Sequence, residues 1–140
     1  MIAIASDHAG YKLKLELIEH FKKIGAEFND LGPYCEKPTD YPVYAKAAAK
    51  TVLDKEADFG VLICGTGIGV SIAANKIRGI RCALCHDIFS AKAARAHNDA
   101  NMLALGGRMI GARLAAEITD AFLSTAFSGE ERHRRRIDAL

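Results

Sequence analysis

The segment LICGTGIGVSIAANK, residues 62–76, places a cysteine beside three alternating glycines. An apolar run ends at Cys64, then come Gly65, Gly67 and Gly69, and a stretch with helical spacing follows. A glycine turn between a strand and a helix directs backbone N–H groups at one point, where an oxyanion or a phosphate group can bind. The turn has neither the lysine of a P-loop nor the third glycine of a dinucleotide fingerprint. A turn that only packs the strand against the helix is the alternative.

Cys64 is the last residue of the predicted strand before this turn. Backbone N–H dipoles at such a place favour a thiolate, which can act as a base or as a nucleophile. A cysteine taken at random is more often a buried and inert apolar side chain. The position at the strand end favours the chemical interpretation.

Two histidines near the ends of predicted elements could transfer protons. His8 follows the first predicted strand, and His97 lies in the polar segment AHNDAN, residues 96–101. An imidazole titrates near neutral pH and can serve as an acid or as a base. A solvent-facing or capping role is the alternative, and it suits His20 and His133.

The polar carboxyl-terminal segment contains a run of arginines. Arg132 and Arg136 are one helical turn apart, so both could bind one phosphate, and Arg108 would complete a pocket for a dianion. A solvated basic face is the more common role of such a run, which also includes Arg134 and Arg135.

The elements that must position these residues alternate between strands and helices. Strands are predicted at 1–6, 26–32, 59–64, 79–85 and 100–107, and helices at 11–25, 43–55, 68–77, 87–98 and 112–127, with a further helical tail at about 128–140. This alternation predicts an α/β fold with a five-stranded parallel sheet between two helical layers. Ligands bind such sheets at the carboxyl ends of the strands, where the polar clusters 6–8, 64–69 and 106–108 fall.

The composition indicates a single globular domain spanning residues 1–140. Half of the residues are apolar, 26% are charged, and the formal net charge is only +2. These values give no support to binding of nucleic acid or of a membrane surface, and the first residues do not resemble a signal peptide. We therefore expect a cytoplasmic protein.

The segment CALCH, residues 82–86, matches the haem-attachment pattern, but it is predicted to lie in a buried strand. There its cysteines would be small apolar side chains, and no second ligand pair suggests zinc. The residues thus predict a protein that binds a phosphorylated small molecule and moves a proton next to a carbonyl, with no metal or redox cofactor.

Four motifs together resemble the ribose-5-phosphate isomerase B (RpiB) family, which shares a superfamily with the lactose-pathway sugar-phosphate isomerases. They are SDHAG at 6–10, DYP at 40–42, ICGTGIGVSIAANK at 63–76 and RAHNDANMLALGGR at 95–108. The resemblance covers residues 2 to about 138. It implies a Rossmann-like three-layer α/β/α sandwich and a homodimer, sometimes a tetramer, with active sites shared between subunits. It also implies the metal-free, reversible conversion of ribose 5-phosphate and ribulose 5-phosphate.

The resemblance implies roles for individual residues. Cys64 would be the base that moves the proton between C2 and C1 of the sugar, Thr66 would assist proton transfer at the substrate oxygens, and His97 would open the furanose ring. The other residues would bind the substrate. The loop Gly65, Thr66, Gly67, Ile68 and Gly69 would hold the enediolate oxygen, and Asn98 would support the enediolate. Asp7 would help to hold the sugar, and the phosphate would be bound by His8, Arg108, Arg132 and Arg136.

Two alternatives stay open. Relatives act on allose 6-phosphate, galactose 6-phosphate or four-carbon sugar phosphates, and the sequence does not give the pocket depth that separates these substrates. The segment HND favours the pentose phosphate over the lactose-pathway substrates. A non-catalytic sugar-phosphate-binding protein is the second alternative, but it would have no use for Cys64 and His97 together.

Overall fold

The computed structural model describes residues 1–140, and its core is a sheet of five parallel strands. The strands are β1 (Ile2–Ser6), β2 (Phe28–Asp30), β3 (Phe59–Cys64), β4 (Cys82–Leu84) and β5 (Met102–Gly106). They lie in the order β2-β1-β3-β5-β4, so the chain reverses its direction of winding between β1 and β3. The predicted α/β fold with helices on both faces of a five-stranded parallel sheet is confirmed.

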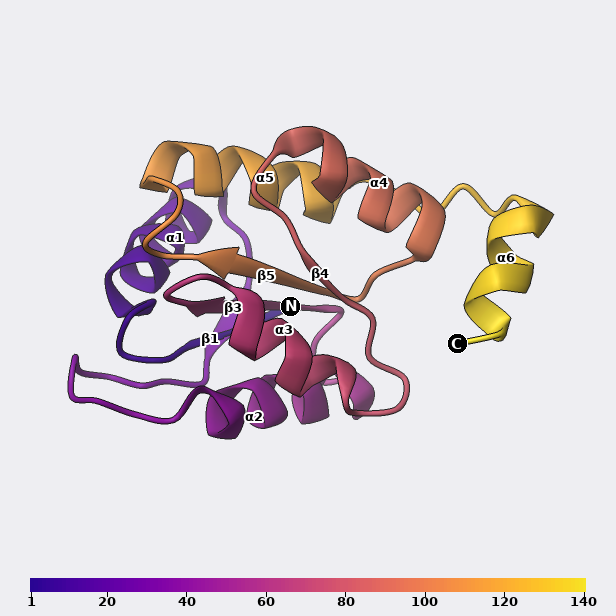
Figure 1. Cartoon of the computed structure of the whole chain (residues 1–140). Coiled ribbons are helices and arrows are strands. Elements are labelled where there is room, and N and C mark those ends of the chain that lie inside the picture. Colours follow the sequence, from indigo (N-terminus) through magenta and orange to yellow (C-terminus); the bar gives the residue numbers. More distant parts are fainter.

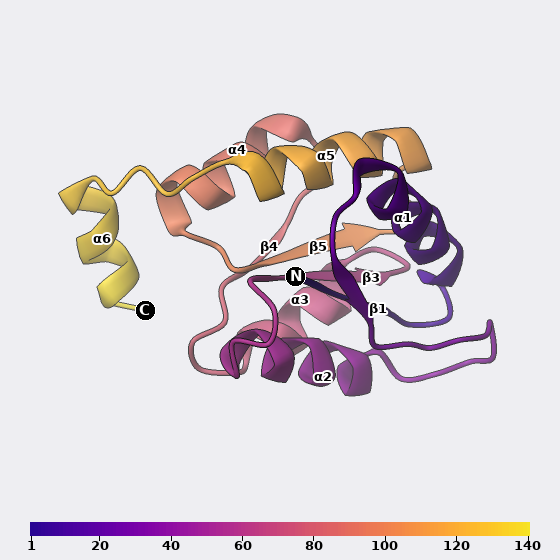
Figure 2. The same cartoon turned by 180° about the vertical axis from the view of Figure 1, so that it is seen from behind.

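Helices cover both faces of this sheet (Figures 1 and 2). The helices α1 (Tyr11–Ile24), α4 (Ile88–Asn98) and α5 (Ala112–Ser124) lie on one face, and α2 (Tyr41–Leu53) and α3 (Ile68–Asn75) lie on the other. The sixth helix, α6 (Glu131–Asp138), stands apart from both layers, beyond the last turn of α4 (Figure 1). No helix is both long and apolar enough to span a membrane.

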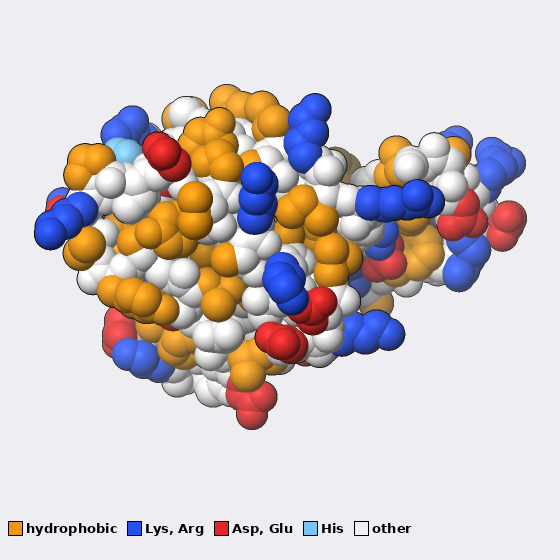
Figure 3. All heavy atoms as spheres, turned by 90° about the horizontal axis from the view of Figure 1, so that it is seen from below, with side chains coloured by type: hydrophobic (Ala, Val, Ile, Leu, Met, Phe, Trp, Pro, Cys, Tyr) orange, Lys and Arg blue, Asp and Glu red, His pale blue; other side chains and the backbone are white.

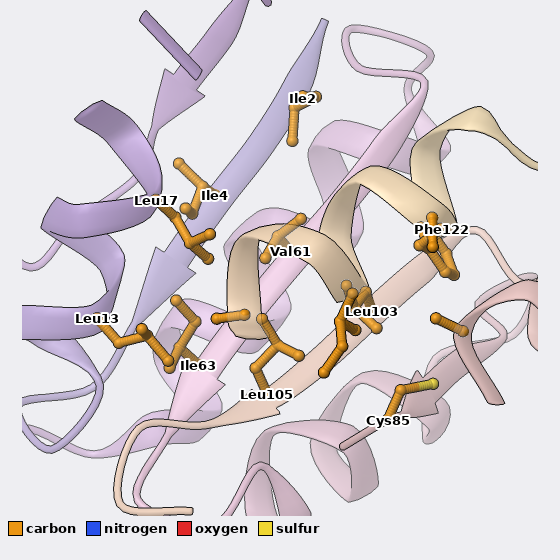
Figure 4. Packing of buried hydrophobic residues seen from close by; sticks show 14 of the residues in the cluster. Ile2, Ile4, Leu13, Leu17, Val61, Ile63, Cys85, Leu103, Leu105 and Phe122 are labelled. Atoms are coloured by element: carbon orange, nitrogen blue, oxygen red, sulfur yellow. The ribbon is translucent and has the colours of Figure 1, made fainter. Parts of the chain in front are cut away.

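The main core lies between the sheet and the α1/α4/α5 layer. Alternate residues of β1, β3 and β5 point into it, among them Ile4, Ile63 and Leu105, and they meet Leu17 of α1 and Phe122 of α5 (Figure 4). These five side chains are fully buried. Burial of a large apolar side chain contributes about 1.5–3 kcal/mol, so this core holds the carboxyl edge of the sheet in place.

Several predicted boundaries differ from the structure by a few residues, and two of the differences have a clear physical reason. The fourth strand was expected to be buried over 79–85, but β4 spans Cys82–Leu84 at the sheet edge, pairs only with β5, and leaves Leu84 exposed. Helix α2 begins at Tyr41 rather than at 43, because Pro42 lies in its first turn, where a missing N–H costs no helical hydrogen bond.

Candidate active site

Three loops meet at the carboxyl ends of β1, β3 and β5, and backbone hydrogen bonds join them. The N–H of Asp7, after β1, donates to the carbonyl of Ile63 in β3 at 3.1 Å. The N–H of Gly107, after β5, donates to the carbonyl of Cys64 at 2.8 Å. The three polar clusters predicted for this edge therefore lie side by side, at the point where the winding of the sheet reverses.

Two glycines allow this close approach. A Cβ on Gly10 would lie only 2.5 Å from the carbonyl oxygen of Ile63, which is backbone and cannot move aside. Gly67 has a φ of +77°, in the left-handed region, and a Cβ there would lie 2.9 Å from the carbonyl carbon of Leu105. A glycine is thus required at position 67 for two reasons, the positive φ of the turn and the close approach of the β5 backbone.

Cys64 ends β3 with its thiol enclosed by the glycine turn. The residue is 5% exposed, and the N–H of Gly67 donates to its Sγ at 3.1 Å. Helix α3 begins at Ile68, so the positive end of its dipole lies next to this sulfur. The N–H of Ile68 donates to Oγ1 of Thr66 at 3.2 Å, which leaves the exposed hydroxyl free to donate its own proton.

A cation and an aromatic ring frame the turn. The guanidinium of Arg108 lies against Gly65, where a Cβ would come within 3.2 Å of Nη1. The ring of Tyr41 packs on Gly69, where a Cβ would lie 2.7 Å from Cζ. Tyr41 was not among the predicted site residues, although the motif DYP contains it.

The loop after β1 holds an acid and a histidine in defined orientations. Asp7 is 7% exposed, and its Oδ1 accepts the N–H of Gly10 at 3.0 Å. The Nδ1 of His8 accepts the N–H of Thr39 at 3.1 Å. Because a backbone N–H can only donate, neutral His8 carries its proton on Nε2 and presents a donor to an anion.

The other predicted residues lie at the opposite end of the sheet. His97 and Asn98 end α4, which runs back from the carboxyl end of β4 to the start of β5, and Arg132 and Arg136 lie on α6. In Figure 1 the arrowhead of β5 points away from α6. One chain therefore does not bring these four residues to Cys64, nor the α6 arginines to Arg108.

A network of arginines fixes the end of α4. Asp99 has a φ of +44°, unusual for a residue with a side chain, and ends the helix. Arg81 donates to the carbonyls of Asn98 and Asp99 at 2.8–3.1 Å, and Nη1 of Arg95 donates to Oδ1 of Asp99 and to the carbonyl of Ala100, both at 2.7 Å. His97 and Asn98 are thus presented to solvent on a rigid turn.

The burial of His133 differs from the role that the sequence suggested. A solvent-facing role suited it, but the structure buries it to 8% exposure with its ring stacked on that of His97. Its place inside a strongly polar segment hid this packing, because its partner lies 36 residues away in the chain (133 minus 97).

The four cysteines are all free thiols. Cys82 packs on the α2/α3 side of the sheet and Cys85 lies in the core on the other side, so they point away from each other. Burial raises the pKa of the Cys82 thiol to about 12, and it also raises the pKa of Cys85. No cluster of three His, Cys, Asp or Glu side chains has a geometry suited to a metal ion.

The fold is a parallel α/β sheet, and a cysteine that accepts a backbone N–H lies where the winding of the sheet reverses. Such a place is typical of a site for a small molecule, and comparison with known proteins gives the class of this protein. The model of the family described as Ribose/Galactose Isomerase matches residues 2–140. The chain belongs to this family of sugar-phosphate isomerases, the RpiB/LacAB family.

Individual relatives match over almost the whole chain. The crystal structure of a ribose 5-phosphate isomerase from Thermotoga maritima superposes with a TM-score of 0.97 at 54% identity, covering 99% of this chain and 94% of that one. The Bacillus subtilis protein named "Putative sugar phosphate isomerase YwlF" is 53% identical over 140 residues, 99% of this chain and 93% of the relative. Escherichia coli ribose-5-phosphate isomerase B is 46% identical over 139 residues, with coverage of 99% and 93%.

Proposed function

We propose that this chain, acting as one catalytic domain over residues 1–140, interconverts ribose 5-phosphate and ribulose 5-phosphate. The observation that carries the proposal is the buried Cys64 thiol, which accepts the N–H of Gly67 at the start of α3. The names of the Escherichia coli and Thermotoga maritima relatives support the pentose phosphate as substrate.

The proton transfer uses Cys64 and Thr66. The thiolate removes the proton from C2 of the open-chain aldose, and the electron pair moves to the C1 oxygen to form a cis-enediolate. The hydroxyl of Thr66 passes a proton from the C2 oxygen to the C1 oxygen. Cys64 then returns its proton to C1 as the C2 oxygen becomes the carbonyl, so the thiolate is restored and no atom is gained or lost.

Backbone groups stabilise the charge that develops during this transfer. N–H groups in the loop 65–69 lie at the positive end of α3, where they can donate to the enediolate oxygen. The loop would therefore stabilise the enediolate, an anion that forms only during the reaction. Asn98 adds a side-chain donor on the other side of the sugar.

The remaining residues open the ring and bind the ends of the substrate. His97 transfers the proton between the ring oxygen and the C1 hydroxyl, and Asp7 holds a sugar hydroxyl. The phosphate is bound by cations and by a neutral imidazole donor, namely Arg108, Arg132, Arg136 and His8. Guanidinium forks suit the phosphate dianion because they donate two hydrogen bonds each.

These roles require two chains in a symmetric homodimer, alone or within a tetramer. The Cys64 cluster and the His97 cluster lie at opposite ends of one sheet, so a second chain has to supply the missing half of each site. Apolar side chains around the glycine turn are exposed, with Ile68 at 50% and Ile72 at 54%, as expected of a surface that a partner covers.

A groove beside α6 supports the same assembly. It measures about 660 Å³ and runs between the segment 75–83 and the end of α6, with Asn98 and Ile137 among its lining residues. Figure 3 shows the arm of α6 projecting beside the α2/α3 face, on which many apolar side chains are exposed. A second copy of the chain that fills this groove would bring its own glycine turn towards His97 and the α6 arginines.

Turnover by the purified protein tests the proposal. The assay is run with EDTA on ribose 5-phosphate beside allose 6-phosphate, galactose 6-phosphate and erythrose 4-phosphate, and we expect the highest kcat/KM on ribose 5-phosphate. A preference for another sugar would keep the mechanism and change the substrate.

The Cys64→Ala variant is the matched control, because it removes the base and leaves the phosphate-binding residues in place. We expect it to bind the sugar phosphate and to lose turnover. Near-native turnover of this variant would refute the base assignment. Binding without turnover by the unaltered protein would show a sugar-phosphate-binding protein instead of an enzyme.

A further inference from the structure

Helix α6 contacts the rest of the chain mainly through one buried side chain, with Arg134 lying over Phe127 and Ile137 lining a groove beside Asn98. Its sequence, ERHRRRID, contains four arginines, and His133 is the only one of its residues that is buried. The imidazole of His133 stacks on that of His97 with ring centroids 4.6 Å apart and planes 16° from parallel. A backbone hydrogen bond from the N–H of Ser128 to the carbonyl of Ala96, at 3.0 Å, secures the connection just before the helix.

We propose that His133 is a positioning residue: its stacked ring docks α6 on the end of α4 and so sets Arg132 and Arg136 relative to His97. This inference rests on the proposed function, in which His97 opens the sugar ring and the two arginines bind the phosphate. The distance between a ring oxygen and a phosphate is fixed by the substrate, so the two groups that meet them need a fixed separation as well. His133 is the side chain that joins them.

The contact that His133 makes with His97 depends on its ring and not on a hydrogen bond from Nε2. Its Nε2 is buried and has no hydrogen-bond partner, so an apolar ring would be the more stable filler at this place. Burial, and then the charges of His97 and Arg132, lower the pKa of His133, while Glu130 acts in the opposite direction.

Three variants of α6 test the proposal. His133→Ala removes the stack, His133→Phe keeps an aromatic ring on His97 without a titrating group, and Arg135→Ala is the control on an exposed position of the same helix. For His133→Ala we expect a higher KM for ribose 5-phosphate and a fall in kcat/KM of roughly 10-fold to 100-fold, the usual effect of a misplaced catalytic group. His133→Phe should recover most of this loss, and Arg135→Ala should match the unaltered protein.

A readout without turnover separates this proposal from the proposed function. In NMR spectra, the imidazole C–H resonances of His97 should lose their ring-current shift in His133→Ala and keep it in His133→Phe, and the amides of α6 should exchange faster in His133→Ala alone. Unchanged His97 resonances and α6 exchange in His133→Ala would overturn the docking role even if the protein turned over no sugar phosphate. Native kinetics of His133→Ala on an active protein, or a loss in His133→Phe as large as in His133→Ala, would overturn the positioning role.

Discussion

A mixed dimer of one Cys64→Ala chain and one His97→Asn chain is expected to show about half of the activity of the unaltered dimer, although each parent protein is nearly inactive. The expectation follows from the position of Cys64 at the carboxyl end of β3 and of His97 at the far end of α4. In a two-fold symmetric dimer, each site then takes Cys64 from one chain and His97 from the other. The mixed dimer holds one site with both changes and one site with neither.

The assay uses two differently tagged chains, purified in succession so that only mixed dimers are measured on ribose 5-phosphate. The reciprocal dimer combines the double variant Cys64→Ala, His97→Asn with an unaltered chain, and it should be nearly inactive because each of its sites carries one change. Sites built within single chains would give the opposite pair of results, an inactive first dimer and about half activity in the second. That outcome would refute the shared-site reasoning.

Further expectations concern stability and reactivity. Gly67→Ala should lower the free energy of unfolding, measured in urea, by about 1–3 kcal/mol, because the φ of +77° and the nearby backbone of β5 oppose a Cβ. Gly111→Ala is the control and should cost less, because its Cβ would enter open space. Equal losses in the two variants would contradict the steric argument. Because the pKa of His133 is lowered in the folded chain, the unfolded chain binds this proton more tightly, and stability should fall as the pH drops through 6.5. In thermal melts at pH 5 and pH 7, His133→Phe should reduce this loss of stability. An identical pH dependence of the two proteins would contradict the contribution of His133. Burial raises the pKa of the Cys82 thiol to about 12, so iodoacetamide at pH 8 should label the exposed Cys35 and leave Cys82 unmodified. Peptide mass mapping measures the labelling of each cysteine. Equal labelling of the two would show that burial does not protect Cys82.

The regular elements were predictable because their signals are local. Apolar residues such as Leu13, Leu17 and Phe21 recur at helical spacing, and all three are buried in α1. The glycine turn after Cys64 was also visible, since a continuous apolar strand ends there and a helix begins. The order of the strands was not predictable in this way, because the pairing of β5 with both β3 and β4 depends on contacts between distant segments.

The sequence by itself determined the alternating strands and helices, the cysteine and glycines at a strand end, and the motifs that mark the family. Tertiary structure decided which of the predicted site residues share a location. It joins Asp7, Cys64 and Arg108 at one edge, because parallel strands end together and their loops exchange backbone hydrogen bonds. It sends His97 to the other edge, because a crossover helix must run back to the start of the next strand. It also buries His133, since a lone imidazole in a charged helix has no local signal for the ring on which it stacks.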